Sequence, residues 1–533
     1  MNNLFKIAID LDNTIINYDK VFLNLALKKK LITAKNILTK KTLRDHIRNR
    51  KGGEKDWQKL QGSVYGKYIK DAWIFPGFQK FLWRCNSQQI HVEIVSHKTI
   101  YGHYDETRTN LRDSAQSFLF EKLGSKSFES IKKIVFYSTL EKKIEYLENS
   151  AFDLVIDDLE EVLKSINSNK IKKILFNPSK EKTSFLNYSN WEHISMSLFP
   201  PMDPDIVDKY CFDFLGLSFS QTSNLKGRAN AQVFSSYLDK EKIVIKLYSQ
   251  DRGNMRFDRE IRALNAFHRI GIKNVQSLIN SNEIYGLAAF KWIQGTGINY
   301  ANSEMIGCML DFIDQLYKNK NHEVFSKIGN ASDACLSMLS IENQIGRRFE
   351  ELISQNNEEL SNFLVSEFLP VFQEVKSWAR KSYGLYENPL DVGDQTLSPS
   401  DFGLHNIINT SSGLFFIDFE YFGWDDPVKL ISDFILHPAM QLNLKEYRQW
   451  HLGATQIFGD KITKRLNFSF PLYALNWCLI LMNVYKDYNW SKQVSINSLL
   501  IEEKENILHD RLSESRFRLE KIKMNYLKGI FYG

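Results

Sequence analysis

Short apolar runs and helical patterns alternate through the first 200 residues. Phe5–Ile9, Val92–Val95 and Phe152–Ile156 are apolar and rich in β-branched residues, and each predicts a buried strand. The stretches between them include segments that read as helices. Strands that alternate with helices predict an α/β domain.

The pattern changes after residue 205. Ala231–Tyr237 and Lys242–Tyr248 predict paired strands joined by a tight turn. Tyr285–Gln294 predicts another strand, followed by a turn at Gly295-Thr296-Gly297, and from Ser303 to Tyr386 the pattern is almost wholly helical. Strands followed by a long helical region predict an α+β domain.

The segment Phe199–Asp205 separates the two patterns. It contains Pro200, Pro201 and Pro204, and such a stretch resists both helix and strand. A chain of 533 residues is too long for one core. We therefore predict a linker here, between domains at 1–200 and 205–533.

Composition narrows the class of protein. Hydrophobic residues make up 43% and charged residues 25%, as in soluble globular proteins. A net charge of +6 suits small anionic substrates and is too weak to indicate nucleic acid. Five scattered cysteines without a CxxC pair argue against disulfides or zinc. We see no signal peptide, and Phe470–Tyr485 predicts a buried helix rather than a membrane span. We expect a cytoplasmic protein; the oligomeric state is not determined by the sequence.

Two carboxylates, Asp10 and Asp12, follow the first predicted strand at i and i+2. Their mutual repulsion is usually offset by a bound cation. The DxDxT pattern Asp10–Thr14 resembles the nucleophile motif of haloacid dehalogenase (HAD) phosphatases. By that resemblance, Asp10 attacks phosphorus to form an aspartyl-phosphate, and Asp12 serves as the acid and base.

The other motifs of that family follow in order. Ser96 matches the residue that hydrogen-bonds the phosphoryl group, and Lys142 matches the lysine that stabilises the intermediate, with Lys143 nearly as plausible. Asp157, at the end of the third predicted strand, matches an acidic metal motif. The resemblance implies an α/β, Rossmann-like HAD domain, and it implies that Asp10 and Asp157 bind Mg²⁺.

A basic helical insert, at about residues 18–70, separates the first two motifs. It includes Lys28–Lys30, Lys40-Lys41, Arg44, Arg48 and Arg50-Lys51. The insert predicts a small cap. The basic residues would either attract a phosphorylated substrate or form a solvated helix face. The second interpretation is favoured, because runs of charged residues are usually solvated helix faces.

A second motif lies in Leu397–Pro427. Asp401 is followed by Asn406 five residues later, and an apolar run then leads to Asp418. Phosphoryl transfer from a nucleotide needs a carboxylate for the acceptor hydroxyl and an Asn and an Asp on Mg²⁺. The stretch resembles the catalytic loop of aminoglycoside phosphotransferases and choline kinases, although Pro399-Ser400 stands where that family carries His-Gly. The resemblance implies that Asp401 is the base and that Asn406 and Asp418 bind Mg²⁺. It also implies a two-lobed α+β, protein-kinase-like domain, with an N-lobe over about 205–295 and a C-lobe over about 296–533.

Lys246, on a predicted strand, and Glu260, on a predicted amphipathic helix, match the kinase pair that contacts the phosphates of ATP. A loop that includes Asn224–Arg228 is the candidate cover for the nucleotide. Asp433 is expected to be structural, and His437 suggests no chemistry.

The predicted function is a bifunctional kinase and phosphatase that uses ATP and Mg²⁺. Its expected substrate is a small molecule, with a sugar or sugar phosphate favoured by analogy. In a second interpretation, only one domain is catalytic and the other binds a nucleotide or phosphate as a regulatory module. A nucleotide-binding scaffold without turnover and an aminoglycoside phosphotransferase are two further interpretations that the residues leave open.

Overall fold

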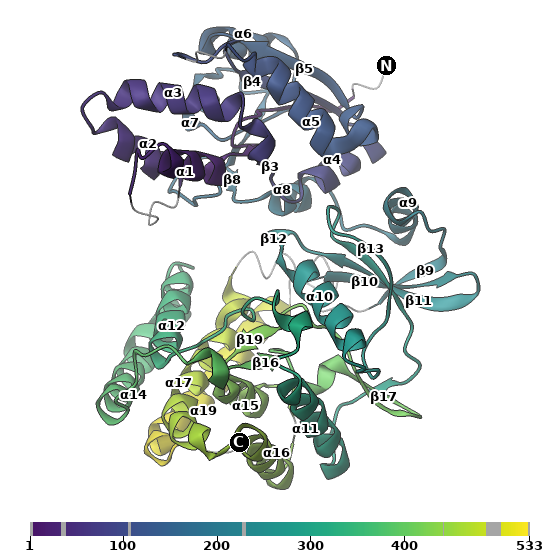
Figure 1. The fold of residues 1–533 in the computed structure, drawn as a ribbon, viewed down its shortest axis with the longest axis vertical. Helices are drawn as coiled ribbons and strands as arrows, with labels where there is room; N and C mark the ends of the chain where they lie inside the picture. The colour runs from purple at the N-terminus through teal and green to yellow at the C-terminus, as the bar shows by residue number, and fades with distance from the viewer. Residues whose placement is uncertain are drawn as a thin grey trace. The chain divides into compact units, whose positions relative to one another are not determined.

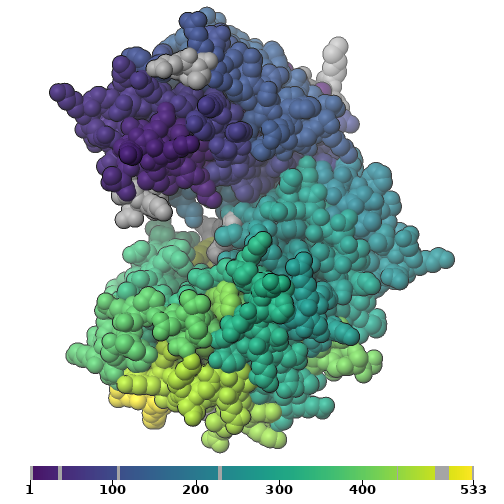
Figure 2. Space-filling model, in the orientation of Figure 1, coloured from purple at the N-terminus to yellow at the C-terminus, as the bar shows by residue number. Residues whose placement is uncertain are grey.

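The computed structural model describes residues 4–33, 39–104, 108–225, 231–440, 442–486 and 503–530. It divides into two compact units, Met1–Pro200 with Ser249–Gly253, and Pro201–Tyr248 with Asn254–Gly533. Each unit is a closely packed body in the space-filling view, purple to blue for the first and teal to yellow for the second (Figure 2). Much of the predicted nucleotide-covering loop, residues 226–230, lies outside the described residues.

The first unit is built on a parallel sheet in the strand order β5-β4-β1-β6-β7-β8 (Figure 1). The strands are β1 Lys6–Ile9, β4 His91–His97, β5 Ile131–Tyr137, β6 Leu154–Asp157, β7 Lys172–Phe176 and β8 Asn187–Tyr188. Ile7 and Ile9 pack into one core cluster and Ala8 into another, because alternate side chains of a strand point to opposite faces. Both faces are therefore buried, as parallel sheets require.

Helices complete the first unit. They are α1 Asp19–Lys28, α2 Lys40–Arg48, α3 Gly53–Tyr65, α4 Phe78–Ser87, α5 Leu111–Phe128, α6 Leu140–Asn149, α7 Glu160–Ser165 and α8 Trp191–Leu198. Helices α1–α3 form the insert predicted over residues 18–70, and their apolar side chains, such as Phe22 and Trp57, stack at 5.0 Å between ring centroids. The short strands β2 Ile16–Asn17 and β3 Trp73–Ile74 pair at the two ends of this insert.

The second unit begins with helix α9 (Pro204–Leu215), which corrects the prediction that the whole of 199–205 is a linker. Proline at the first helical position loses no hydrogen bond, and the Asp203 side chain caps the helix by accepting from Ile206 N at 2.9 Å. The division between the units still falls inside the proline-rich segment, between Pro200 and Pro201.

A five-stranded antiparallel sheet follows, in the order β13-β14-β11-β10-β9. Its strands are β9 Ser220–Leu225, β10 Ala231–Leu238, β11 Glu241–Tyr248, β13 Leu278–Asn282 and β14 Leu287–Lys291. The predicted hairpin is confirmed: Asp239 and Lys240 join β10 to β11, with φ of 49° and 71°. Positive φ at both residues is typical of a two-residue hairpin turn. Helix α10 (Met255–Arg269) comes after this hairpin.

The rest of the second unit is mainly helical (Figure 1). Its helices are α11 Ser303–Lys318, α12 Met338–Ile353, α13 Glu358–Asn362, α14 Leu369–Ser382, α15 Pro427–Leu436, α16 Leu444–Phe458, α17 Thr463–Leu481 and α19 Lys504–Asn525. One helical run, Asp460–Tyr485, is long and apolar enough to cross a membrane by composition, but 72% of its most apolar window is buried inside the protein. This run contains the predicted buried helix.

Small strands in this region carry the second motif. They are β15 Thr296–Gly297, β16 Thr396–Ser398, β17 Ile407–Thr410, β18 Gly413–Phe416 and β19 Gly423–Asp425. The turn predicted at 295–297 is wrong in part, because Thr296 and Gly297 pair with β17. A Cβ at Gly295 would lie 2.4 Å from the carbonyl oxygen of Asn409, so this close backbone approach requires glycine.

Candidate active sites

Asp10 and Asp157 lie side by side in the first unit. Strands β1 and β6 pair with Ile9 opposite Ile156, so the residue after β1 meets the last residue of β6. The Nζ of Lys143 donates to Asp10 Oδ1 and to Asp157 Oδ2, each at 2.6 Å. All three side chains are buried. The fold therefore brings together the two carboxylates that the sequence assigned to nucleophile and metal binding.

The lysine of this cluster is Lys143, which corrects the choice of Lys142. Thr139 caps α6 by accepting from Lys142 N, and this start of the helix turns Lys143 and Leu147 inward while Lys142 faces solvent. Residues four apart share one face of a helix. The spacing of Lys143 from the apolar Leu147 was the signal that distinguishes the two lysines.

Asp12 is held by two donors that the sequence did not single out. The hydroxyl of Tyr18 donates to Asp12 Oδ1 at 2.7 Å, and the buried Lys98 lies 2.7 Å from Asp12 Oδ2. Ser96, two residues before Lys98, is buried, and its Oγ has no hydrogen-bond partner among the described residues. A buried hydroxyl without a partner costs free energy unless a ligand bonds it, which fits the role predicted for Ser96.

Carboxylates outnumber cations where β1 and β6 end. Oxygens of Asp10, Asp157 and Asp158 lie within 4.8 Å of one another. Burial, together with the charges of Asp157 and Asp12, raises the pKa of Asp10 to about 7 against the opposing charge of Lys143. Three carboxylates are a ligand set that suits Mg²⁺, so these residues fit the ion that the resemblance implies. Asp158 joins the two predicted ligands.

In the second unit, Lys246 joins three elements. Its Nζ, on β11, lies 2.7 Å from Glu260 Oε2 on α10 and 2.8 Å from Asp418 Oδ1 after β18. The hydroxyl of Tyr248 also donates to Glu260 Oε2, at 2.7 Å. The predicted Lys246–Glu260 pair is therefore present, and it places the lysine beside a predicted metal ligand.

Asp401, Asn406 and Asp418 are brought together by hydrogen bonds of the loop itself. The Asn406 side chain donates to the Asp401 carbonyl at 2.9 Å, and Ile417 N donates to the Asn406 carbonyl at 2.9 Å. Asp418 has φ 66° and Ser400 φ 65°. Left-handed backbone at non-glycine residues costs on the order of 1–3 kcal/mol each and is concentrated at functional sites. Asn406 and Asp418 supply the oxygens that Mg²⁺ prefers.

Two histidines that suggested no role in the sequence flank Asp401. His405 Nε2 lies 3.2 Å from Asp401 Oδ2, and His437 Nε2 lies 3.6 Å from Asp401 Oδ1. Their rings stack with centroids 4.8 Å apart. Burial acts to raise the pKa of Asp401, but His405, His437 and Asn406 outweigh it and hold the pKa below its usual value. Asp401 is therefore ionised, as a base must be.

Asp401, His405 and His437 also lie close enough together to hold a metal ion. His437 argues against that interpretation. Ala439 N donates to His437 Nδ1 at 3.1 Å, so this nitrogen is the acceptor and Nε2 carries the proton. A protonated nitrogen cannot bind a metal, whereas it can donate toward Asp401. We therefore interpret His437 as a residue that orients the carboxylate.

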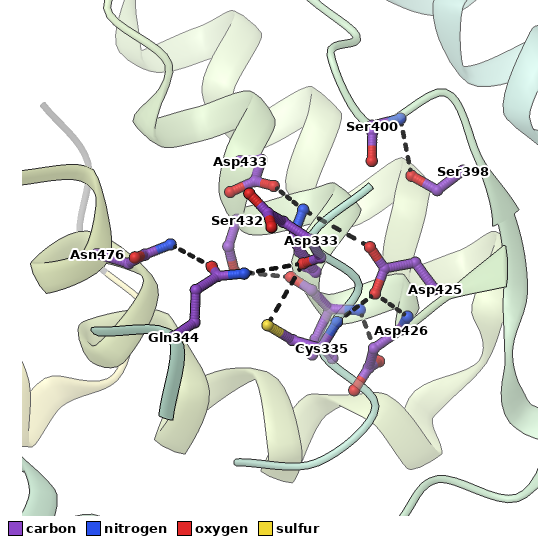
Figure 3. A network of polar contacts seen from close by, with 12 residues as sticks. Asp333, Cys335, Gln344, Ser398, Ser400, Asp425, Asp426, Ser432, Asp433 and Asn476 are labelled. Atoms are coloured by element: carbon purple, nitrogen blue, oxygen red, sulfur yellow. Dashed lines mark hydrogen bonds and ion pairs between the residues drawn. The ribbon is translucent and has the colours of Figure 1, made fainter. Parts of the chain in front are cut away.

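A buried polar network lies next to the segment Ser398–Ser400, which leads to Asp401 (Figure 3). Asp425 Oδ1 accepts from Cys335 N at 2.9 Å and from Asp426 N at 2.8 Å. Strand β19, which ends at Asp425, pairs with β16, which leads into the loop. Burial raises the pKa of Asp425 to about 6, and the nearby Lys429 opposes that rise. Asp433 bonds Lys429 and Trp477, so it has structural partners, as expected.

Glu420 lies two residues beyond Asp418. Burial and the Asp418 charge raise the pKa of Glu420 to about 7, and Lys246 and Arg256 oppose the rise. Its Oε2 is 3.7 Å from Lys246 Nζ. The acidic character of the site thus extends beyond the predicted ligands.

No family model and no curated protein matches the chain. Solved structures do. One is the spectinomycin phosphotransferase APH(9)-Ia in complex with ADP and spectinomycin, with 14% identity and a TM-score of 0.42, covering 60% of this chain and 99% of that one. Another is an ethanolamine kinase of Plasmodium vivax, with 14% identity and a TM-score of 0.40, covering 64% and 97%. A third is a choline/ethanolamine kinase family protein of Mesorhizobium loti, with 13% identity and a TM-score of 0.38, covering 57% and 93%.

The chain is similar to these proteins over about 60% of its length. At these identities and TM-scores the likeness is one of fold and leaves the activity open. The phosphatase prediction for residues 1–200 has no support from these comparisons and stays a prediction. The functional argument therefore rests on the two sites.

Proposed function

We propose that the second unit is an ATP-dependent kinase for a small hydroxyl compound. The observation that carries the proposal is the contact of Lys246 with both Glu260 and Asp418, in a unit that also holds the Asp401–Asn406 loop. Lys246 would bind the phosphates of ATP, and Glu260 fixes the position of its ammonium group. Asp401 would orient the acceptor hydroxyl and take its proton as that oxygen bonds to the γ-phosphorus, while the bond from that phosphorus to the β–γ bridging oxygen breaks and ADP leaves.

Asn406 and Asp418 would hold Mg²⁺ in this unit. The ion would neutralise charge on the phosphates of the nucleotide, which is the chemistry it supplies in phosphoryl transfer. Lys246 lies against Asp418, so the same carboxylate would face both the ion and the lysine.

We further propose that the first unit is a phosphate monoester hydrolase. The supporting observation is the buried contact of Lys143 with Asp10 and Asp157 at the ends of adjacent strands. An oxygen of Asp10 would attack phosphorus, and Asp12 would protonate the departing alcohol. Asp12 would then take a proton from water, whose oxygen attacks the aspartyl-phosphate and releases phosphate. Asp10, Asp157 and Asp158 would hold Mg²⁺, which offsets the charge of the phosphoryl group.

If a kinase and a phosphatase in one chain acted on the same position of the same compound, they would only consume ATP in a futile cycle. We therefore propose that the two units act on different positions or on successive intermediates. A sugar phosphate, which has several hydroxyl groups, is the substrate class that this arrangement suits, by analogy alone. Aminoglycoside phosphorylation is less favoured, because inactivating a drug has no clear use for a hydrolase.

ADP release and phosphate release should be measured in parallel, with Mg²⁺-ATP and a panel of sugars, sugar phosphates, amino alcohols and aminoglycosides. We expect Asp401→Asn to lower ADP release by at least about 10²-fold, a typical contribution of a general base. Asp10→Asn should abolish hydrolysis of a phosphate ester and leave ADP release intact.

Loss of both activities in either variant would contradict the two-site proposal. Nucleotide binding without turnover of any compound would indicate a sensor or scaffold in the second unit. Near-normal ADP release by Asp401→Asn would mean that another residue is the base.

A further inference from the structure

The basic residues of the helical insert divide into two groups. Lys41, Arg44 and Arg48 lie at the surface, where each pairs with a carboxylate. Lys41, for example, pairs with Glu181 while both side chains are more than half exposed. These residues fit the solvated face that the charge run predicts.

Lys40 differs from its neighbour Lys41. It is partly buried, and its Nζ donates to the hydroxyl of Tyr65 at 2.7 Å. The ammonium also lies 5.4 Å from the ring centroids of Phe22 and Tyr65. All these partners are neutral, and among the described residues no carboxylate oxygen lies within 4.0 Å of Lys40 Nζ.

Tyr65 connects Lys40 to the acid–base residue. The Nζ of Lys98 lies 4.5 Å above the Tyr65 ring and pairs with Asp12 on its other side. The ring of Tyr18, whose hydroxyl bonds Asp12, packs 4.8 Å from the Tyr65 ring. Lys40 therefore reaches from the insert to the side of the catalytic cluster on which the leaving group would depart.

Lys40 has no carboxylate in direct contact among the described residues. Lys143 and Lys98 are each paired with carboxylates, whereas the ammonium group of Lys40, which has three N–H donors, donates to a phenol. Burial acts to lower the pKa of Lys40, but Tyr65, Asp158 and Asp12 outweigh it and raise the pKa, so the group is charged. The two carboxylates act from beyond direct contact, and an anionic group of a ligand would bond the ammonium group directly.

We infer that Lys40 is a subsite for a second anionic group of the phosphatase substrate. The inference rests on the proposed hydrolase function of the first unit. The phosphoryl group to be removed would be bound by Ser96, Lys143 and the cation that Asp10, Asp157 and Asp158 would hold, which leaves Lys40 for a group on the alcohol part. The substrate class is then a phosphate monoester that carries another phosphate or a carboxylate.

Glucose 1,6-bisphosphate and glucose 6-phosphate test the subsite, because they differ by one anionic group. The ratio of their kcat/KM values should favour the bisphosphate in the wild type. Lys40→Met keeps the packing on Phe22 and Tyr65 and removes the charge, and it should lower this ratio at least about 10-fold, since hydrogen bonds to charged groups are strong. Lys40→Arg should restore part of the ratio. The matched control, Lys41→Met, should leave the ratio unchanged.

Equilibrium binding to the Asp10→Asn enzyme separates this inference from the hydrolase proposal, because it needs no turnover. The subsite is supported if the bisphosphate binds more tightly than the monophosphate and if adding Lys40→Met removes this difference. This result supports the subsite even if no ester is hydrolysed. Equal binding of the two sugars, or an equal loss for both on adding Lys40→Met, would overturn it. Absence of hydrolysis in the wild type would contradict only the hydrolase proposal.

Discussion

In the first unit, Lys143 bridges carboxylates on two neighbouring strands of one sheet, whereas in the second unit Lys246 joins a strand, a helix and a loop. The first cluster is closed, with side-chain exposures of 3%, 9% and 1% for Lys143, Asp10 and Asp157. In the second cluster, Asp418 is 37% exposed. In the first cluster, the pairing of β1 with β6 places the two carboxylates side by side, and helix α6 adds the lysine. The second depends on tertiary packing to bring residues 246, 260 and 418 together.

This difference indicates which contacts are most sensitive to mutation. Asp10 and Asp157 are adjacent because their strands hydrogen-bond, so the lysine between them is needed for charge rather than for assembly. Asp401 stands in a loop, and its orientation depends on side chains from other elements, including His437 after α15. We therefore expect large losses in the first site from changes of charge, and moderate losses in the second from changes of orientation.

The largest expected effect is that of Lys143→Met. It removes the cation that contacts Asp10, the carboxylate proposed to attack the phosphoryl group, and loss of one such electrostatic contact costs on the order of 10²–10³ in turnover. Phosphate ester hydrolysis should therefore fall by at least about 10²-fold, with ADP release unchanged. Lys142→Met, at the adjacent exposed position, is the control. Equal losses in the two variants would refute the assignment of Lys143.

The next effect is on stability. The pKa of Asp425 is raised from 3.8 in the unfolded chain to about 6 in the folded protein. Between about pH 4 and pH 6, the folded protein therefore keeps a proton on this carboxyl that the unfolded chain has lost. The folded state binds more protons in this window, and stability falls as the pH rises through it, by about 2–3 kcal/mol in total. Asp425→Asn keeps an oxygen for the two amide donors and should flatten this dependence.

The free energy of unfolding of the second unit, measured by chemical denaturation at pH 4.5 and 6.5, gives this slope. The exposed Asp460→Asn serves as the control and should keep the wild-type slope. If Asp425→Asn also keeps it, Asp425 is ionised in the folded protein throughout this range.

The smallest effect is that of His437→Phe. The phenyl ring can stack on His405 as the imidazole does, but it has no N–H to direct toward Asp401. We expect kcat of the proposed kinase to fall about 10-fold with KM for ATP unchanged, because orientation of the base acts in the transition state. His437→Gln, which retains a donor, should recover part of kcat. The control is His268→Gln, at an exposed position. A rise in KM for ATP in His437→Phe would indicate a structural role for His437 instead.

Much of the framework could be predicted from local pattern. The strands at 5–9, 92–95 and 152–156, the hairpin at 231–248 and the pair Lys246–Glu260 all appear close to their predicted positions. Carboxylates that directly follow buried strands could be identified because parallel strands end at one edge of a sheet. The error at Lys142 came from matching a motif by position, when the helix face decides which lysine points inward.

What the sequence by itself determined is the set of elements and the strand-end carboxylates, because both follow from periodicity over a few residues. Only the tertiary structure decided which side chains meet across separate elements: Lys98 on Asp12, His437 on Asp401, and Lys40 on Tyr65. Isolated lysines and histidines have no periodic signal. Their roles are fixed by packing across long loops, where burial and the loss of solvent turn an ordinary side chain into a partner for a charge.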